Sequence, residues 1–216
     1  MSSPAHHYTL LRASCYLSLA GLLMLAGCAR QPLQPEPAKA IPAPPPIVEQ
    51  WQQYQALLNA IDQWQLQGKL GVRLPDHSGS VYVNWRQQQG DYAIHLSGPL
   101  GQGTTWIRGN DSSVELENSD GKIRAATPEQ LMLDSLGWWL PVSDLHYWIR
   151  ALPAPSASAA TLQRNADGTL AQLQQAGWTL LYSGYQAVEG WPLPGRVVAR
   201  RDDISLTFII KSWDFY

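Results

Sequence analysis

Short segments in which apolar and polar residues alternate, separated by turn signals, limit most strongly what this chain can fold into. The first segment covers 64–74, and the others cover 80–88, 92–97, 104–108, 113–118 and 122–126. Residue pairs that favour turns, such as Asn110-Asp111 and Asp120-Gly121, lie between them. Alternation places apolar side chains on one face of a strand, and tight turns join neighbouring strands. The pattern therefore predicts an antiparallel meander.

Three segments follow the period of a helix instead of a strand. They cover 48–61, 128–137 and 143–152. Thr127 and Ser143 are predicted to cap the second and third of these helices, and Pro153 follows the third. Residues 153–168 are rich in Ala, Ser and Pro and are predicted to form a loop.

Strands return in the last part of the chain. They are predicted at 169–175, 178–185, 193–201 and 204–211, with 213–216 as a short edge strand. Apart from the pair of helices in the middle, no helix lies between successive strands, which excludes a doubly wound α/β fold. We expect an α+β domain, mostly β, with a large curved antiparallel sheet of about 11 strands and about three helices over one side.

Residues 1–27 are predicted to be a lipoprotein signal peptide rather than part of the fold. Residues 16–27 are apolar and uncharged, too short a run to span a membrane but typical of a signal peptide. The run ends in Leu25-Ala26-Gly27-Cys28, which resembles the lipobox of bacterial lipoproteins. We therefore expect lipidation of Cys28, and Ala29 in place of an Asp indicates the outer membrane. The alternative is a buried helix with an incidental Cys.

A proline-rich tether, residues 28–46, is predicted to follow the lipidated Cys28. Seven of the residues in 29–46 are Pro, which favours an extended polyproline II conformation that could span up to about 55 Å. The folded domain is expected at 47–216. Because Cys15 would leave with the signal peptide and Cys28 would carry lipid, this domain must fold without a disulfide.

Composition and motifs argue against several classes of function. The net charge is −2 and there is no run of Lys or Arg, so a nucleic-acid-binding protein is not expected. His77, His95 and His146 are far apart in sequence, and no metal site is predicted. The chain shows no GxSxG motif, and 98–103 lacks the Lys-Ser/Thr of a phosphate loop. We expect a protein that is not an enzyme and carries no cofactor, although acidic turn residues can still meet in space.

Apolar surface is the remaining feature from which a function can be inferred. The apolar faces of the strands and of helices 128–137 and 143–152 form either a dry core or a cavity for acyl chains. Abundant Trp and Tyr favour the cavity, because rings with a polar edge suit a mouth that is sometimes wet. The residues predicted to contact acyl chains are Trp85, Ile94, Leu96, Leu131, Leu136 and Trp148.

Leu100 lies in an unusual loop between two predicted strands. Gly98-Pro99 precedes it and Gly101-Gln102-Gly103 follows it, so neighbouring side chains offer it little shelter. It either folds back and packs, or forms a hydrophobic tip that enters a membrane. Burial of one Leu side chain is worth about 1.5–3 kcal/mol, enough for transient insertion next to a lipid anchor.

Several segments together resemble the LolB family of outer-membrane lipoprotein receptors. They are WQLQGKLGVR at 64–73, LSGPLGQG at 96–103, HYWIRALP at 146–153, WTLLYSGY at 178–185 and IIKSWDF at 209–215. The resemblance covers about 50–216 and the lipobox. It implies an unclosed antiparallel barrel with a helical lid over an apolar cavity.

The resemblance also implies a function. Such a protein would accept lipoproteins from a LolA-type periplasmic chaperone and insert them into the outer membrane, with Leu100 promoting insertion. The expected partners are this chaperone, the lipoprotein cargo and outer-membrane lipid. We expect a monomer, lipid-anchored in the outer membrane and facing the periplasm. The alternative is a lipid-anchored periplasmic protein that binds another apolar ligand or is a scaffold for outer-membrane assembly.

Overall fold

The structure is a computed structural model that describes residues 51–99, 103–136, 139–155 and 160–216. The predicted signal peptide (1–27), the predicted tether (28–46) and Leu100 lie outside the described residues. Every element described below belongs to one compact unit, Ile41–Tyr216.

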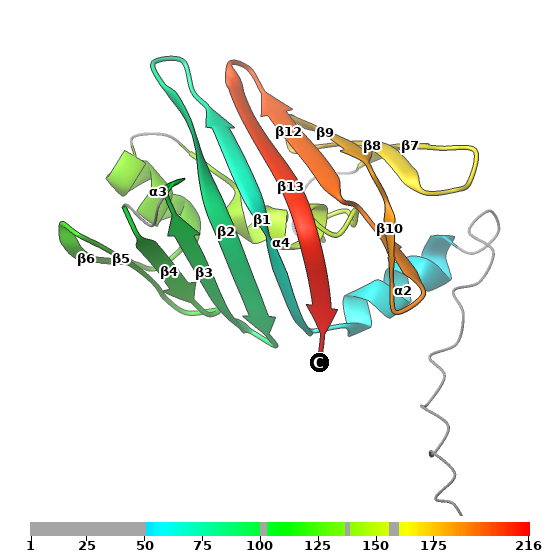
Figure 1. The fold of residues 1–216 in the computed structure, drawn as a ribbon, viewed down its shortest axis with the longest axis horizontal. Coiled ribbons are helices and arrows are strands. Elements are labelled where there is room, and N and C mark those ends of the chain that lie inside the picture. Colours follow the sequence, from blue (N-terminus) through cyan, green and yellow to red (C-terminus); the bar gives the residue numbers. More distant parts are fainter. Residues whose placement is uncertain (1–50, 100–102, 137–138, 156–159) are drawn as a thin grey trace, which may run out of the picture. The chain divides into compact units, whose positions relative to one another are not determined.

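Eleven antiparallel strands form one open sheet in the order β6-β5-β4-β3-β2-β1-β13-β12-β9-β8-β7 (Figure 1). Their bounds are β1 Gln63–Arg73, β2 Ser78–Gln88, β3 Asp91–Ser97, β4 Thr105–Gly109, β5 Val114–Asn118, β6 Gly121–Ala125, β7 Thr161–Arg164, β8 Leu170–Gln175, β9 Trp178–Ser183, β12 Arg196–Arg201 and β13 Ile204–Phe215. The edge strands β6 and β7 do not pair with each other, so the sheet does not close. The prediction of an unclosed antiparallel sheet of about 11 strands is confirmed.

The first and last strands of the domain are neighbours at the centre of the sheet. In the β1–β13 pair, Trp64 lies opposite Phe215 and Leu70 lies opposite Phe208. The register shifts between Gln67 and Gly68, and a Cβ on Gly68 would overlap the carbonyl oxygen of Ile209. The absence of a side chain at Gly68 therefore permits the close approach of β1 and β13 at this irregularity.

Three helices are described: α2 Trp51–Ala60, α3 Pro128–Leu136 and α4 Val142–Trp148. The N-terminus of α3 is capped as predicted, because the backbone N–H of Gln130 donates to Thr127 Oγ1 at 3.2 Å. In Figure 1, α4 passes behind β1 and β13. We call the sheet face that α4 covers the inner face, and the opposite face the outer face.

Three predictions about local structure were wrong. The segment predicted to be a loop, 153–168, contains β7, which extends the sheet beyond β8; with Leu162 as its only large apolar side chain, it has no clear alternation. Residues 213–216 do not form a separate edge strand, because β13 continues to Phe215 at the centre of the sheet. Ser143 does not cap α4. Pro141 is the N-cap residue, and the backbone N–H of Ser143 donates to the side chain of Glu129, at Oε1, at 2.9 Å.

The predicted strand 193–201 is also shorter in the structure. A hairpin of β10 (Gln186–Val188) and β11 (Trp191–Leu193) precedes β12 and forms a separate two-stranded sheet. A turn at Glu189-Gly190, both with positive φ, joins β10 and β11. The sequence analysis did not find this hairpin, because three-residue strands are too short for an alternation to be visible.

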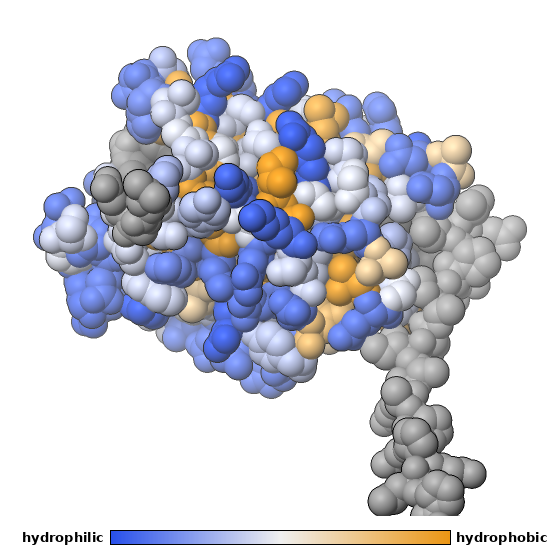
Figure 2. All heavy atoms as spheres, viewed as in Figure 1, coloured by the Kyte–Doolittle hydropathy of each residue, from blue (hydrophilic) through white to orange (hydrophobic). Residues whose placement is uncertain are grey.

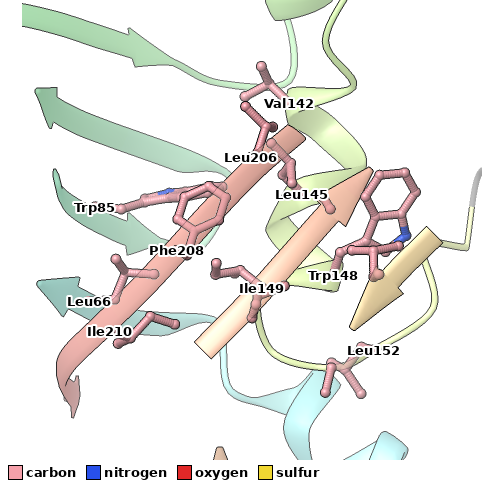
Figure 3. Close-up of a cluster of buried hydrophobic side chains, with 14 of the residues drawn as sticks. Leu66, Trp85, Val142, Leu145, Trp148, Ile149, Leu152, Leu206, Phe208 and Ile210 are labelled. Atoms are coloured by element: carbon pink, nitrogen blue, oxygen red, sulfur yellow. The ribbon is translucent and has the colours of Figure 1, made fainter. Parts of the chain in front are cut away.

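The hydrophobic core lies between the inner face and the helices. Figure 3 shows side chains of α4 and the following turn directed toward those of β1, β2 and β13. Leu66 and Trp85 come from the sheet, and Leu145 and Ile149 approach them from the helix side; all are buried. The strand alternation recognised in the sequence is therefore the alternation between this core and the outer face.

Candidate functional site

An apolar cavity of about 130 Å³ lies between the inner face of the sheet and helices α3 and α4. Five strands and both helices, with the link between the helices, contribute its walls. The lining residues are Leu70, Val72, Val83, Trp85, Ile94, Leu96, Ile107, Met132, Leu140, Val142, Leu145, Leu206 and Phe208. None of these side chains is charged, so the cavity suits an apolar ligand.

Strand register assembles the sheet wall of the cavity. Trp85 pairs with Ile94, and Ile94 pairs in turn with Ile107, which forms one continuous row across β2, β3 and β4. In the next inward row, Val83 pairs with Leu96. Directly opposite side chains on one face of an antiparallel pair lie close together, so two short rows provide most of this wall.

The cavity is small in this structure. A cavity of about 150 Å³ holds one molecule of the size of benzene, and this one is slightly smaller. A long alkyl chain needs several times that volume. The cavity at this size is therefore too small for such a chain unless the helices move away from the sheet.

The structure separates the six residues predicted to contact acyl chains into three groups. Trp85, Ile94 and Leu96 line the cavity. Leu131 and Trp148 are buried in the core but do not line it. The side chain of Leu136 lies outside the described part, and Met132 is the residue of α3 that faces the cavity. Contact of any of them with a ligand stays a prediction.

A chain of hydrogen bonds lies next to the cavity. Gln87 Nε2 donates to the carbonyl oxygen of Gln89 at 2.7 Å, which leaves Gln87 Oε1 facing His146 Nδ1 at 3.1 Å. His146 Nε2 lies 3.0 Å from Arg150 Nη2. Because a guanidinium can only donate, Nε2 accepts this hydrogen bond and the proton of the neutral ring is on Nδ1, directed at Gln87.

Burial controls the charge state of this cluster. Burial first, and then the positive charge of Arg150, lowers the pKa of His146 to about 3. Burial likewise lowers the pKa of Arg150 to about 10. At neutral pH the imidazole is therefore uncharged and the guanidinium remains positively charged, with its charge also facing the rings of Trp64 and Tyr147.

Arg150 and Gln175 attach the C-terminal end of α4 to the rest of the domain. Arg150 Nη1 donates to the carbonyl oxygens of Leu58 and Ile61, at 2.8 and 3.0 Å. Gln175 Oε1, on β8, accepts from the indole N–H of Trp148 at 2.9 Å. These bonds connect the C-terminal end of α4 to the end of α2 and to β8.

A more polar hollow of about 430 Å³ adjoins the cavity and shares Trp85 and Val142 with it. Gln87, His146 and Asp111 are among its other lining residues. No group of three or more His, Cys, Asp or Glu side chains that could hold a metal ion occurs in the described residues. The two adjoining spaces therefore provide an apolar pocket with a polar margin.

The sequence alone did not point to Met132, Phe208 or the His146–Arg150 pair as parts of the site. The alternation of Leu206, Phe208 and Ile210 in the last strand was visible, but its position beside β1 was not. His146 and Arg150 are four residues apart, a spacing that brings side chains together on a helix, and this signal was available.

Comparison with known proteins agrees with this architecture. The family model described as outer membrane lipoprotein LolB matches residues 62–213. This chain belongs to the LolB family. An outer-membrane lipoprotein LolB from Pseudomonas savastanoi pv. phaseolicola is 42% identical over 198 residues, which is 89% of this chain and 91% of the relative. Its counterpart in Pseudomonas aeruginosa strain LESB58 is 38% identical over 208 residues, 94% of this chain and 97% of the relative.

A solved structure shares the fold of this LolB-family domain. A LolA superfamily protein from Nitrosomonas europaea superposes with a TM-score of 0.53 at 11% identity, over 76% of this chain and 93% of that protein. At this identity the likeness concerns the fold alone. Among the described residues of this LolB-family chain, no helix is long and apolar enough to cross a membrane.

Proposed function

We propose that this chain is an outer-membrane receptor that accepts lipoproteins from a LolA-type periplasmic chaperone, binds their acyl chains in the apolar cavity and inserts them into the outer membrane. Membership of the LolB family supports the assignment. The observation that carries it is the cavity itself, which is walled by uncharged, mostly aliphatic side chains between the sheet and α3 and α4. No catalytic group is part of the proposal.

Cargo enters when α3 moves outward from the sheet. The C-terminal end of α4 stays attached through Arg150 and Gln175, so the cavity opens on the side of α3 and Met132. Acyl chains then replace contacts between the helices and the sheet. Transfer needs no nucleotide, because the chains move toward the site that binds them more strongly and finally to the bilayer.

The receptor is a monomer that is anchored through lipid on Cys28. The tether 28–46 connects this anchor to the domain, which faces the periplasm. The alignments with the LolB relatives cover 89–94% of this chain, which is more than residues 51–216 alone. They therefore extend into the N-terminal segment that contains the tether. Leu100 promotes the last step, in which the cargo enters the bilayer.

A transfer assay with two matched variants tests the function. A LolA-type chaperone loaded with a fluorescent lipoprotein is mixed with the receptor, and the label bound to each protein is measured. Leu96→Gln places an unpaired amide in the cavity wall, at a cost of about 1–3 kcal/mol, so we expect about 5- to 150-fold weaker uptake of cargo. His95→Gln, on the adjacent residue of the outer face, is the control and should leave uptake unchanged.

Two outcomes of this assay would contradict the proposed function. Equal uptake by both variants, with both folded, would remove the cavity from the mechanism. A wild-type protein to which no label moves would favour the scaffold for outer-membrane assembly instead. Photo-crosslinking from Trp85 and Ile94 provides an independent measurement, because only a cavity that holds acyl chains brings cargo to these buried positions.

A further inference from the structure

The four central strands of the sheet are strongly basic. Strands β2, β1, β13 and β12 contain seven Lys or Arg residues and one acidic residue, Asp214, in a chain whose net charge is −2. Arg201 lies over the ring of Trp139. The other six are exposed and form what we call the basic face: Lys69, Arg73, Arg86, Arg196, Arg200 and Lys211.

Strand register gathers these cations on the outer face. Ile209 pairs with Lys69 on one side and with Arg196 on the other. Two rows further along the same face, Ser205 pairs in the same way with Arg73 and Arg200. Since neighbouring strands lie about 4.8 Å apart, the two cations of each row are separated by about 10 Å. Four positive charges therefore flank β13 in two rows, with the row of Thr207 between them.

The charges of the basic face are not neutralised within the domain. None of its six residues forms an ion pair with another described residue, whereas Arg108, Lys122 and Arg124 near the β6 edge pair with Glu115 and Glu117. Acidic groups lie around the edges of the basic face. They are Asp214 near the end of β13, Asp91 at the start of β3, and Asp76, Asp202 and Asp203 in the turns that join β1 to β2 and β12 to β13.

Two exposed, largely apolar side chains lie next to the cations: Ile209 lies between Lys69 and Arg196, and Tyr82 lies beside Lys69. Tyr82 is 44% exposed and Ile209 is 38% exposed, and Lys69 Nζ lies 5.1 Å from the centre of the Tyr82 ring. Figure 2 shows this face as mainly hydrophilic, with separate small hydrophobic areas. Long cationic side chains mixed with Tyr and isolated aliphatic groups suit the headgroup region of a bilayer, where phosphates are close to apolar carbon.

We propose that the basic face docks on anionic lipid headgroups, so that the outer face lies against the bilayer while α3, α4 and the cavity face away from it. Electrostatic attraction falls off within about 8 Å at physiological ionic strength. The six cations act together only when the sheet lies parallel to the membrane surface. Members of the family are outer-membrane lipoproteins, which places such a surface near the domain.

This orientation leaves the cavity accessible from the aqueous side while the receptor waits for cargo. It rests on attachment to a membrane and not on the binding of acyl chains, so it can fail while the proposed function holds. An acidic protein surface is the competing occupant. The exposed Tyr82 and Ile209, together with the spread of the cations over four strands, favour lipid.

The test measures which face of the lipidated protein is next to the membrane. A fluorophore is attached to Ser80→Cys, on the outer face of β2, or to Ser143→Cys, on α4; both positions are exposed. The mature protein is reconstituted into phosphatidylcholine vesicles with or without 30% phosphatidylglycerol, which carry a quencher on the headgroups. We expect at least threefold stronger quenching at Ser80→Cys than at Ser143→Cys in the anionic vesicles only, and loss of this difference in 0.5 M salt.

Charge-reversed and charge-conserving variants show whether the difference in quenching depends on the positive charges of the basic face. Lys69→Glu, Arg196→Glu and Lys211→Glu combined should abolish the difference, and the charge-conserving combination Lys69→Arg, Arg196→Lys and Lys211→Arg should keep it. If the reversed variant does not fold, Lys69→Gln with Lys211→Gln should still reduce the difference at least twofold. Equal quenching at both positions, or a difference that survives charge removal, overturns the proposal.

Cargo uptake from the chaperone is measured on the same samples. We expect uptake to be unchanged by charge reversal, because the cavity lies on the other side of the sheet. If uptake falls at least tenfold while quenching is unaffected, the basic face recognises an acidic protein surface and the lipid proposal is wrong.

Discussion

Arg150 Nη2 donates a hydrogen bond of 3.0 Å to His146 Nε2, which joins a buried cation to a partly buried imidazole. The contact exists only while the imidazole is neutral, because a protonated ring has no acceptor. The same guanidinium holds two carbonyl oxygens at the end of α2. The protonation state of His146 is thereby coupled to the contact between the end of α4 and the end of α2.

We expect the domain to lose stability on mild acidification. The pKa of His146 is about 3 in the folded protein, against 6.5 for an ordinary histidine. Because the folded pKa is lowered, the unfolded chain binds more protons between these values, and stability falls as the pH drops below 6.5. The loss is about 1.4 kcal/mol per pH unit, or about 2 kcal/mol between pH 7.5 and 5.

Thermal melting measures this dependence. A loss of about 2 kcal/mol lowers the melting temperature by about 4–8 °C in a domain of this size. Most surface carboxylates stay ionised above pH 5, so they contribute little in this interval. His146→Gln should flatten the profile, and a variant that keeps the full wild-type slope would assign it to other groups.

Replacement of Arg150 should destabilise the domain more than replacement of an exposed arginine. Arg150→Met removes the guanidinium donor from the carbonyl oxygens of Leu58 and Ile61. Leu58 still accepts from the N–H of Ile61, but the loss of two hydrogen bonds to a charged group costs about 1–3 kcal/mol for each. We expect a loss of about 2–4 kcal/mol in urea unfolding. Arg86→Met, on the exposed face of β2, is the matched control and should change stability by less than about 0.5 kcal/mol.

Two glycines of β1 should respond differently to the same substitution. In Gly68→Ala the new Cβ would overlap the backbone oxygen of Ile209, so β1 and β13 must separate. In Gly71→Ala the nearest atoms belong to Thr207 at 3.8 Å, an ordinary contact. We expect Gly68→Ala to cost at least about 2 kcal/mol and Gly71→Ala to be neutral or slightly stabilising. Similar unfolding free energies for the two variants would contradict the close approach at Gly68.

Lipidation of Cys28 is tested by mass spectrometry of the protein purified from membranes. We expect a mature chain that begins at Cys28 and carries acyl groups, because several acyl chains are needed for stable anchoring. Cys28→Ala should give uncleaved precursor or a soluble product. An unmodified Cys28 in the membrane-bound protein would refute the anchor.

Leu100 separates cargo uptake from insertion. If it enters the bilayer, Leu100→Glu loses about 1.5–3 kcal/mol of burial and adds a charge that lipid disfavours. We expect this variant to melt normally and take up cargo but fail to release it into liposomes, while Leu100→Phe retains both steps. A packed Leu100 would instead make Leu100→Glu melt several degrees lower and impair both steps equally.

Local patterns in the sequence predicted most of the strands and, where the alternation was clear, which side chains share a face. Trp85, Ile94 and Leu96 were assigned to the inner face because alternation is a property of each strand by itself. The cap at Thr127 was equally local. Prediction failed where a strand was short or lacked alternation, as in β7 and the β10–β11 hairpin, and where a contact with another helix decided the role, as at Ser143.

Only the tertiary structure decided three features of the molecule. They are the size of the cavity, the contact of the His146–Arg150 pair with α2, and the basic face. Lys69 and Arg73 are more than 120 positions away from Arg196 and Arg200, and the sequence shows no run of basic residues. They become neighbours because β13 pairs with both β1 and β12 in a defined register. The sequence by itself determined which face each side chain takes, since backbone pleating is local; which distant side chains share that face depended on strand pairing, which no local pattern encodes.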